Sequence, residues 1–175
     1  MESISIVPVK RDDLAKLQTI SRSTFAQTFD EHNNPEDMQA YLDASFSAEK
    51  LLAELNNINS AFYFAMEKNS NKIVGYLKVN TGDAQTEKND LNAFEIERIY
   101  VDKAYFGKKV GQLLFDKAIE IANSKKVSYV WLGVWEENHR ALAFYTKNGF
   151  KAFDKHLFKL GNDVQTDIMM KLTLA

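Results

Sequence analysis

The spacing of hydrophobic residues changes several times along the chain, and each change marks a predicted element. Residues 3–9 alternate polar and β-branched side chains, which predicts a short strand. Residues 12–25 carry apolar side chains at the spacing of an amphipathic helix. Two further helices are predicted to begin at Pro35 and just after Ser47, because Pro in a first helical turn and Ser before an apolar stripe are typical helix starts.

The apolar period falls to two after the third helix, and strands then alternate with helices. The polar residues 81–92 predict a loop. The pattern predicts strands at 61–67, 72–80, 94–101, 127–135, 151–160 and 165–174, a helix at 108–124, and a short helix at 137–148 that ends at Gly149. This order predicts one α/β domain over residues 1–175, with a mixed central sheet of about seven strands flanked by helices.

Composition narrows the classes of protein that fit this pattern. Apolar residues make up 45% of the 175 residues and charged residues 26%, which is typical of a soluble globular domain. The formal net charge of −2 makes nucleic acid an unlikely partner. The N-terminus lacks the features of a signal peptide, and no apolar run is long enough for a membrane span. We therefore expect a cytoplasmic location without membrane attachment.

The residue types also exclude several chemistries. The chain has no cysteine, which excludes disulfides, thiolate metal sites and a cysteine nucleophile. The three histidines, His32, His139 and His156, are too scattered for a metal signature, so no metal cofactor is expected. Any group transfer is then expected to use direct attack rather than a thiol intermediate.

A strand, a basic turn and a helix between Glu95 and Gly111 have the features of an anion site. The turn contains Gly107, Lys108 and Lys109, and it leads into a helix N-terminus, where unpaired N–H groups and the positive end of the dipole attract phosphate. A solvated basic turn is the simpler alternative. Neither G-x-x-x-x-G-K-[ST] nor G-x-G-x-x-G occurs here.

Residues 138–150 read NHRALAFYTKNGF, and this run resembles the GNAT superfamily of N-acetyltransferases at every fixed position of N-x-x-A-x-x-F-Y-x-x-x-G-F. The order of elements agrees with that family. Its phosphate signature, Q/R-x-x-G-x-G/A, falls on residues 106–111. Here Phe106 replaces Gln or Arg, Lys109 replaces the first Gly, and only Gly111 is kept.

Four runs, at residues 34–42, 94–101, 131–136 and 161–167, are similar to the bacterial PaiA-type spermidine/spermine acetyltransferases. The resemblance implies a GNAT fold and the transfer of an acetyl group from acetyl-CoA to a primary amine. It also implies that about residues 94–150 bind the acetyl-CoA. It makes a polyamine the leading acceptor. Another amine, such as a protein N-terminus, or a non-catalytic role in regulation remains an alternative, and a homodimer is left open.

The resemblance also implies roles for individual residues. Tyr145 would protonate the departing thiolate, and Glu97, with Glu95 nearby, would take the proton of the amine through water. Substrate-binding residues would be Glu95, Trp135 and Glu136. Implied cofactor contacts are Ile99, Tyr100, Val101, Gly107, Lys108, Lys109, Val110, Gly111, Gln112, Asn138 and Lys147.

Elementary acid–base chemistry supports these roles. A primary ammonium has a pKa of about 10.4, so only about one amine in 2,500 is free at pH 7 and a proton acceptor is valuable. The pKa of Tyr, about 10, is close enough to the 8.5 of a thiol for proton donation. Strict alternation would put Glu95 and Glu97 on one strand face with Ile99 and Val101, whereas a bulge, which the resemblance implies for this strand, would open a groove between neighbours.

Carboxylates suit a polycationic substrate, and the 81–92 loop adds Asp83, Glu87 and Asp90. Trp131 and Trp135 lie four residues apart on one strand and face the same way, which favours packing in the core over substrate stacking.

Overall fold

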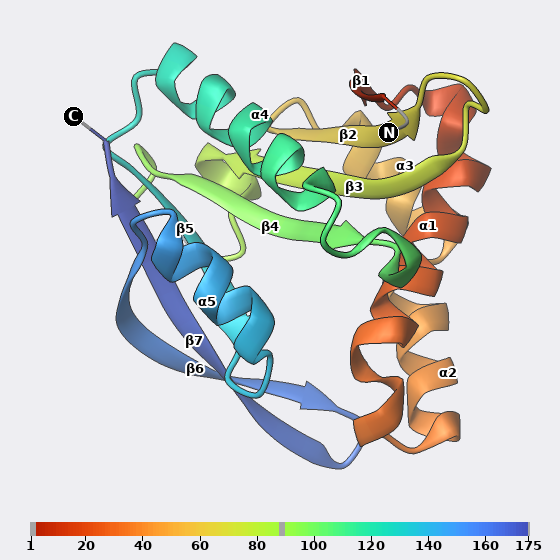
Figure 1. The fold of residues 1–175 in the computed structure, drawn as a ribbon. Helices are drawn as coiled ribbons and strands as arrows, with labels where there is room; N and C mark the ends of the chain where they lie inside the picture. The colour runs from red at the N-terminus through yellow and green to blue at the C-terminus, as the bar shows by residue number, and fades with distance from the viewer. Residues whose placement is uncertain (1–2, 88–89, 175) are drawn as a thin grey trace.

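The computed structural model describes residues 3–87 and 90–174, so two residues of the predicted acidic loop lie outside the description. Figure 1 shows a twisted sheet with helices on both faces. Its seven strands follow the order β1 (Ile4–Pro8), β2 (Ser60–Glu67), β3 (Ile73–Thr81), β4 (Phe94–Val101), β5 (Tyr129–Trp135), β7 (Asp163–Thr173), β6 (Lys151–Leu160). Only β4 and β5 pair in parallel. The predicted mixed sheet is confirmed.

The two larger hydrophobic clusters of the described residues lie on opposite faces of this sheet. Tyr76 and Leu77 are neighbours on β3, yet they belong to different cores, because successive side chains point to opposite faces. The core around Tyr76 packs under α1 (Leu14–Phe29), α2 (Pro35–Ser45) and α3 (Ala48–Asn56). The core around Leu77 packs under α4 (Val110–Ser124) and α5 (His139–Lys147). Short 3₁₀ turns are η1 (Arg11–Asp13), η2 (Asp30–His32), η3 (Gly82–Ala84) and η4 (Lys103–Tyr105).

Local capping explains where several helices begin and end. The side chain of Asn34 accepts a hydrogen bond from Glu36 N, and Ser47 does the same from Lys50 N, which confirms both predicted starts. Gly149 follows α5 at φ +95°, a conformation that favours glycine. The α4 helix begins at Val110, two residues later than predicted, since Lys109 adopts the left-handed region with φ +65°.

The central strands β4 and β5 pair only at their beginnings. Their register joins Phe94 to Val130 and Glu95 to Trp131, and the strands diverge beyond these pairs (Figure 1). Because the pairing stops, the edge of β4 that faces β5 is left without a strand partner over the rest of its length. The opening lies between the two helices α4 and α5 on one face of the sheet.

A β-bulge at Glu97 accompanies this divergence. Arg98 pairs with Lys78 and Ile96 pairs with Val79, so Glu97 is the extra residue of β4. Strict alternation along β4 is therefore wrong. The bulge puts Glu97 and Arg98 on the same side, whereas Ile99 and Val101 pack against the core under α4 and α5. The bulge itself agrees with the resemblance.

Candidate active site

A cavity of about 640 Å³ occupies the opening between β4 and β5. Most of the predicted site residues meet in its wall, although they come from four separate segments of the chain. These are Ile99, Tyr100, Val101, Gly107, Lys109, Val110, Gly111, Gln112, Trp135, Asn138, Tyr145 and Lys147. The sequence analysis missed other wall residues, among them Gln27, Thr28, His32, Lys103, Tyr105, Phe106, Glu137 and Arg140.

The turn before α4 presents free backbone donors to this cavity. The first hydrogen bond of the helix joins Leu113 N to Lys109 O, at 3.2 Å. The N–H groups of Val110, Gly111 and Gln112 precede that bond, and the side chain of the N-cap residue Lys109 does not cap them. All three residues line the cavity. The positive end of the α4 dipole therefore faces a space that an anion can enter.

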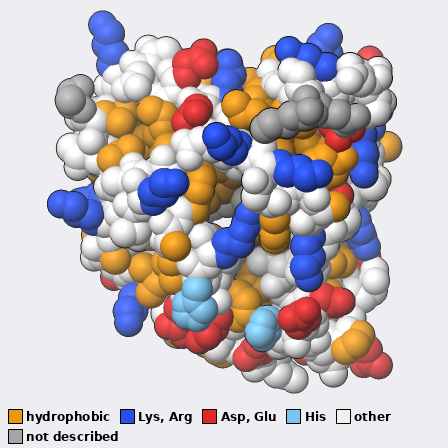
Figure 2. Space-filling model, viewed as in Figure 1, with side chains coloured by type: hydrophobic (Ala, Val, Ile, Leu, Met, Phe, Trp, Pro, Cys, Tyr) orange, Lys and Arg blue, Asp and Glu red, His pale blue; other side chains and the backbone are white. Residues whose placement is uncertain are grey.

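The side chains around this end of the cavity are mostly cationic. Lys103, Lys109, Arg140 and Lys147 line it, against the single carboxylate of Glu137 among the wall residues that the structure describes. Figure 2 shows Lys and Arg side chains on both sides of a hollow in this face, with Asp, Glu and His gathered at its lower end. The cavity thus combines a cationic half with an acidic rim.

Tyr145 reaches the cavity wall from the core side of α5. Only 5% of it is exposed, and its ring packs edge-on against Phe144 and Phe150, with centroid distances of 5.3 and 5.7 Å. Burial raises the pKa of the Tyr145 hydroxyl far above its usual value, so the group keeps its proton at neutral pH. The hydroxyl is therefore positioned to donate a hydrogen bond or a proton into the cavity, but its raised pKa makes it a weaker acid than an exposed tyrosine.

Asn138 caps α5 and still faces the cavity. Its Oδ1 accepts a hydrogen bond from Ala141 N at 3.2 Å, which leaves the NH₂ group of the same amide free to donate. At the other end of the helix, Lys147 places its ammonium in the last turn and lines the same cavity. Both positions agree with the implied cofactor contacts.

The Glu97 carboxylate lies off the cavity wall in a buried ion network. It accepts from Lys78 Nζ at 2.7 Å and from an Arg98 guanidinium nitrogen at 2.9 Å. Both cations also pair with Glu54 of α3, at 3.1 and 2.8 Å. Burial alone would raise the pKa of Glu97, but Arg98 and Lys78 together lower it below its usual value. This carboxylate stays ionised and fully paired.

Glu95 is also held away from the cavity. It accepts hydrogen bonds from the backbone and hydroxyl of Thr86, and one Asn80 amide bridges it to Glu97 at 2.9 and 2.8 Å. Burial raises the pKa of Glu95, and the bonds from Thr86 and Asn80 lower it only in part. Its side chain fixes the 81–92 loop to β4 rather than facing a substrate in the cavity.

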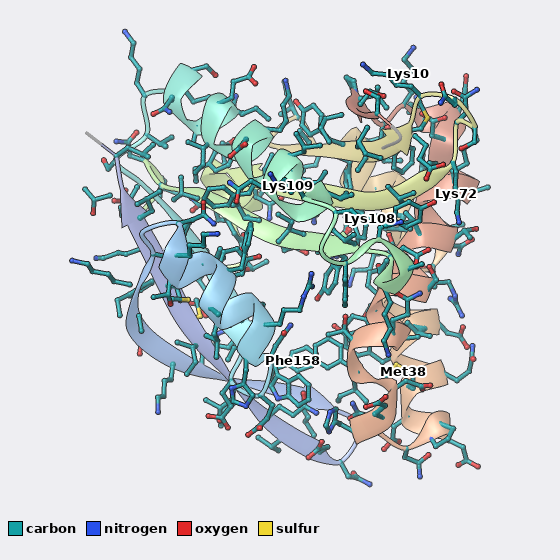
Figure 3. All side chains as sticks on the ribbon, viewed as in Figure 1. Lys10, Met38, Lys72, Lys108, Lys109 and Phe158 are labelled. Atoms are coloured by element: carbon teal, nitrogen blue, oxygen red, sulfur yellow. The ribbon has the colours of Figure 1, made fainter. Side chains whose placement is uncertain are left out.

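Two other predicted residues also lie outside the cavity wall. The Lys108 ammonium lies 5.0 Å from the centre of the Tyr105 ring, and Lys72 lies 5.2 Å from the same ring. Figure 3 shows Lys108 and Lys109 at the turn before α4. Glu136, in the β5–α5 connection, donates its backbone N–H to Thr166 O. The next residue, Glu137, lines the cavity, whereas Glu136 does not.

Comparison of the sequence with known protein families shows which family has this cavity and motif. The sequence model described as the acetyltransferase (GNAT) family matches residues 22–150. The chain belongs to this family. An uncharacterized N-acetyltransferase of Lactobacillus delbrueckii subsp. lactis is 42% identical over the whole of both chains. The spermidine N(1)-acetyltransferase of Thermoplasma acidophilum is 28% identical, covering 87% of this chain and 91% of that protein.

The solved structures agree with the sequence relatives. The crystal structure of the PaiA N-acetyltransferase from Thermoplasma acidophilum in complex with coenzyme A matches 98% of this chain and 99% of its own, with a TM-score of 0.80 and 26% identity. The protein is accordingly a GNAT N-acetyltransferase. The free N–H groups and cations of the cavity fit the phosphates of coenzyme A, which supports acetyl-CoA as the cosubstrate.

Over residues 3–87 and 90–174, no helix is long and apolar enough to cross a bilayer. The same residues contain no group of three His, Asp or Glu side chains arranged to hold a metal ion.

Proposed function

We propose that this GNAT enzyme acetylates a primary amine by direct attack, and that its acceptor is a polyamine such as spermidine or spermine. The observation that carries the proposal is one cavity with a cationic, donor-rich half, a buried Tyr145 and an acidic rim. The amine nitrogen attacks the thioester carbonyl carbon, the carbon–sulfur bond breaks, and the thiolate takes a proton from Tyr145. The amine gives up its proton to a base.

The cosubstrate is bound by three elements in this proposal. The free edge of β4 at Ile99 and Val101 offers backbone donors and acceptors to the amides of the pantetheine arm. The first turn of α4 offers its N–H groups to the pyrophosphate. Asn138 donates from its free NH₂ group, and Lys147 meets the adenosine phosphate.

Two groups are candidates for the base. Glu97 was predicted for this role, and it can act only through water, because its carboxylate lies off the cavity wall and is paired with Lys78 and Arg98. His32 is the alternative. It lines the cavity edge-on to Trp135, with ring centroids 4.9 Å apart, and an imidazole nitrogen can accept a proton.

The acceptor end of the cavity suits an ammonium chain. Trp135 offers an aromatic face and Glu137 a carboxylate, while the connections at this end also carry Asp30, Glu31 and Glu136. The likeness to a protein named spermidine N(1)-acetyltransferase supports the same choice.

The acidic loop does not support the polyamine choice. Its Glu87 and Asp90 line a small separate pocket with Tyr129 and Trp131, away from the main cavity. Trp131 instead donates its indole N–H to buried Gln85, as expected for a residue of the core.

Release of free thiol from acetyl-CoA across a panel of polyamines, monoamines, aminoglycosides and peptides tests the proposal. Spermidine should exceed a monoamine of equal length by at least tenfold in kcat/KM, about 1.4 kcal/mol, and the advantage should shrink with added salt. A monoamine acetylated as fast as spermidine would exclude the polyamine and leave the acetyltransferase. Coenzyme A binding without thiol release for any amine would exclude catalysis.

The two candidate bases are separated by the pH dependence of kcat/KM. Loss of the true base makes the rate depend on bulk deprotonation of the amine, so the rate rises with pH well into the alkaline range. His32→Gln should show this change if His32 is the base, and Glu97→Gln should show it if the relay through water operates.

A further inference from the structure

An exposed aromatic residue occupies the turn before α4. Phe106 is 40% exposed, and it stands where the GNAT phosphate signature has Gln or Arg. The Arg140 guanidinium carbon lies 3.6 Å from the centre of the Phe106 ring. The two side chains reach each other from opposite walls of the cavity, one from the turn and one from the first turn of α5, and both line it.

The stacking leaves the hydrogen-bonding capacity of Arg140 unused. A guanidinium that lies over a ring presents its flat side to the aromatic face and keeps its N–H donors at its edges. Over residues 3–87 and 90–174, Arg140 makes no hydrogen bond or ion pair. A planar fork of free donors beside a helix N-terminus is the arrangement that binds phosphate in a bidentate way.

We infer that Arg140, positioned by Phe106, binds the pyrophosphate of coenzyme A and supplies the polar contact that the side chain at position 106 lacks. The inference rests on the proposed function. The side chain at position 106 has lost its own polar group, but its ring holds a guanidinium from α5 over the same turn whose N–H groups are free. Arg140 is the binding residue and Phe106 is a positioning residue. The phosphate contact has moved across the cavity from one element to another.

Calorimetric titration with truncated cofactors tests the assignment. Arg140→Ala should weaken binding of coenzyme A and of dephospho-coenzyme A by about tenfold or more, equivalent to about 1.4 kcal/mol, and leave binding of pantetheine unchanged. His139→Ala is the matched control, because His139 is an exposed neighbour on the same helical turn that does not line the cavity. Melting of each ligand-free variant checks that the fold is kept.

Variants at Phe106 test the positioning role. Phe106→Leu should weaken binding in the parent but have little effect in the Arg140→Ala background, because the ring acts through the guanidinium. The double variant Phe106→Arg, Arg140→Ala should recover affinity, since it places a guanidinium at position 106.

Three results would overturn the inference. The first is an affinity of Arg140→Ala for coenzyme A equal to that of the parent. The second is an equal loss of affinity for pantetheine. The third is a loss of affinity for coenzyme A but not for dephospho-coenzyme A, because that result would place the contact at the 3′-phosphate. Parent protein that binds no coenzyme A at all would instead refute the proposed function.

Discussion

Replacing Lys109 by glycine should change stability and cofactor affinity in opposite directions. Lys109 adopts φ +65°, a conformation that costs a side chain with a Cβ roughly 1–2 kcal/mol. Glycine removes this strain, but its freer unfolded chain takes back roughly 0.4–1 kcal/mol. The net gain is about 0.5–1 kcal/mol, which corresponds to a rise in Tm of about 1–4 °C for a domain of this size.

The ammonium of Lys109 has a separate role from its backbone. It lines the cationic half of the cavity, so its loss should weaken coenzyme A binding by about 1 kcal/mol, the scale of a charge-assisted hydrogen bond. Lys109→Ala loses the same charge and keeps the strained backbone. Both variants should therefore bind more weakly by titration calorimetry, and only the glycine variant should melt at a higher temperature.

Lys126 provides a matched control just beyond the other end of α4. It follows the C-terminal end of α4 at φ +55°, it is exposed, and it does not line the cavity. Lys126→Gly should raise Tm by a similar amount and leave cofactor affinity unchanged. The reasoning about strain fails if Lys126→Gly stabilises while Lys109→Gly destabilises. The reasoning about charge fails if both Lys109 variants bind coenzyme A as tightly as the parent.

Three other outcomes are expected. Tyr145→Phe should lower turnover about 10-fold to 1,000-fold with little change in coenzyme A affinity, and equal turnover would remove Tyr145 from the mechanism. Saturation with acetyl-CoA at 100 times Kd should stabilise the fold by about 2.7 kcal/mol, about 5–11 °C in Tm, by differential scanning fluorimetry. Glu97→Gln should lower the free energy of unfolding by about 3 kcal/mol at pH 7, because Lys78 and Arg98 lose a buried partner. The folded-state pKa of Glu97 is lowered, so its contribution is present above the unfolded pKa of about 4.3 and is lost as pH falls below that value. The stability gap between Glu97→Gln and the parent should therefore narrow in acid urea titrations, and a gap independent of pH would contradict the ion-pair account.

Local signals predicted the order of elements and much of the cavity wall. The cap at Asn34, the glycine after α5 and the apolar run of β5 each depend on a few neighbouring residues, and such patterns are visible in the sequence. The motif around Asn138 and Tyr145 likewise lies within one short helix, so its resemblance to the GNAT pattern was sufficient to place both residues.

Contacts between distant segments could not be predicted in the same way. The sequence shows Glu97 two residues from another carboxylate, but its environment depends on Lys78 of β3, and the network closes through Glu54 of α3. For the same reason Phe106 was interpreted only as a departure from the phosphate signature. The guanidinium that covers it is 34 positions further along the chain, at Arg140, and no period or motif connects the two.

The buried ion network lies next to the point at which the sheet opens. Two cations and two carboxylates in a protein interior add little net stability, because desolvation offsets most of their attraction. Here the network attaches to both residues of the bulge, Glu97 and Arg98, and it ties them to Glu54 of α3 on the face of the sheet opposite α4. A bulged strand bends, and the parallel pairing of β4 with β5 ends at Glu95, two residues before the bulge. The bulge and its ion network therefore lie beside the opening between β4 and β5, and the free edge of β4 in that opening lines the cavity.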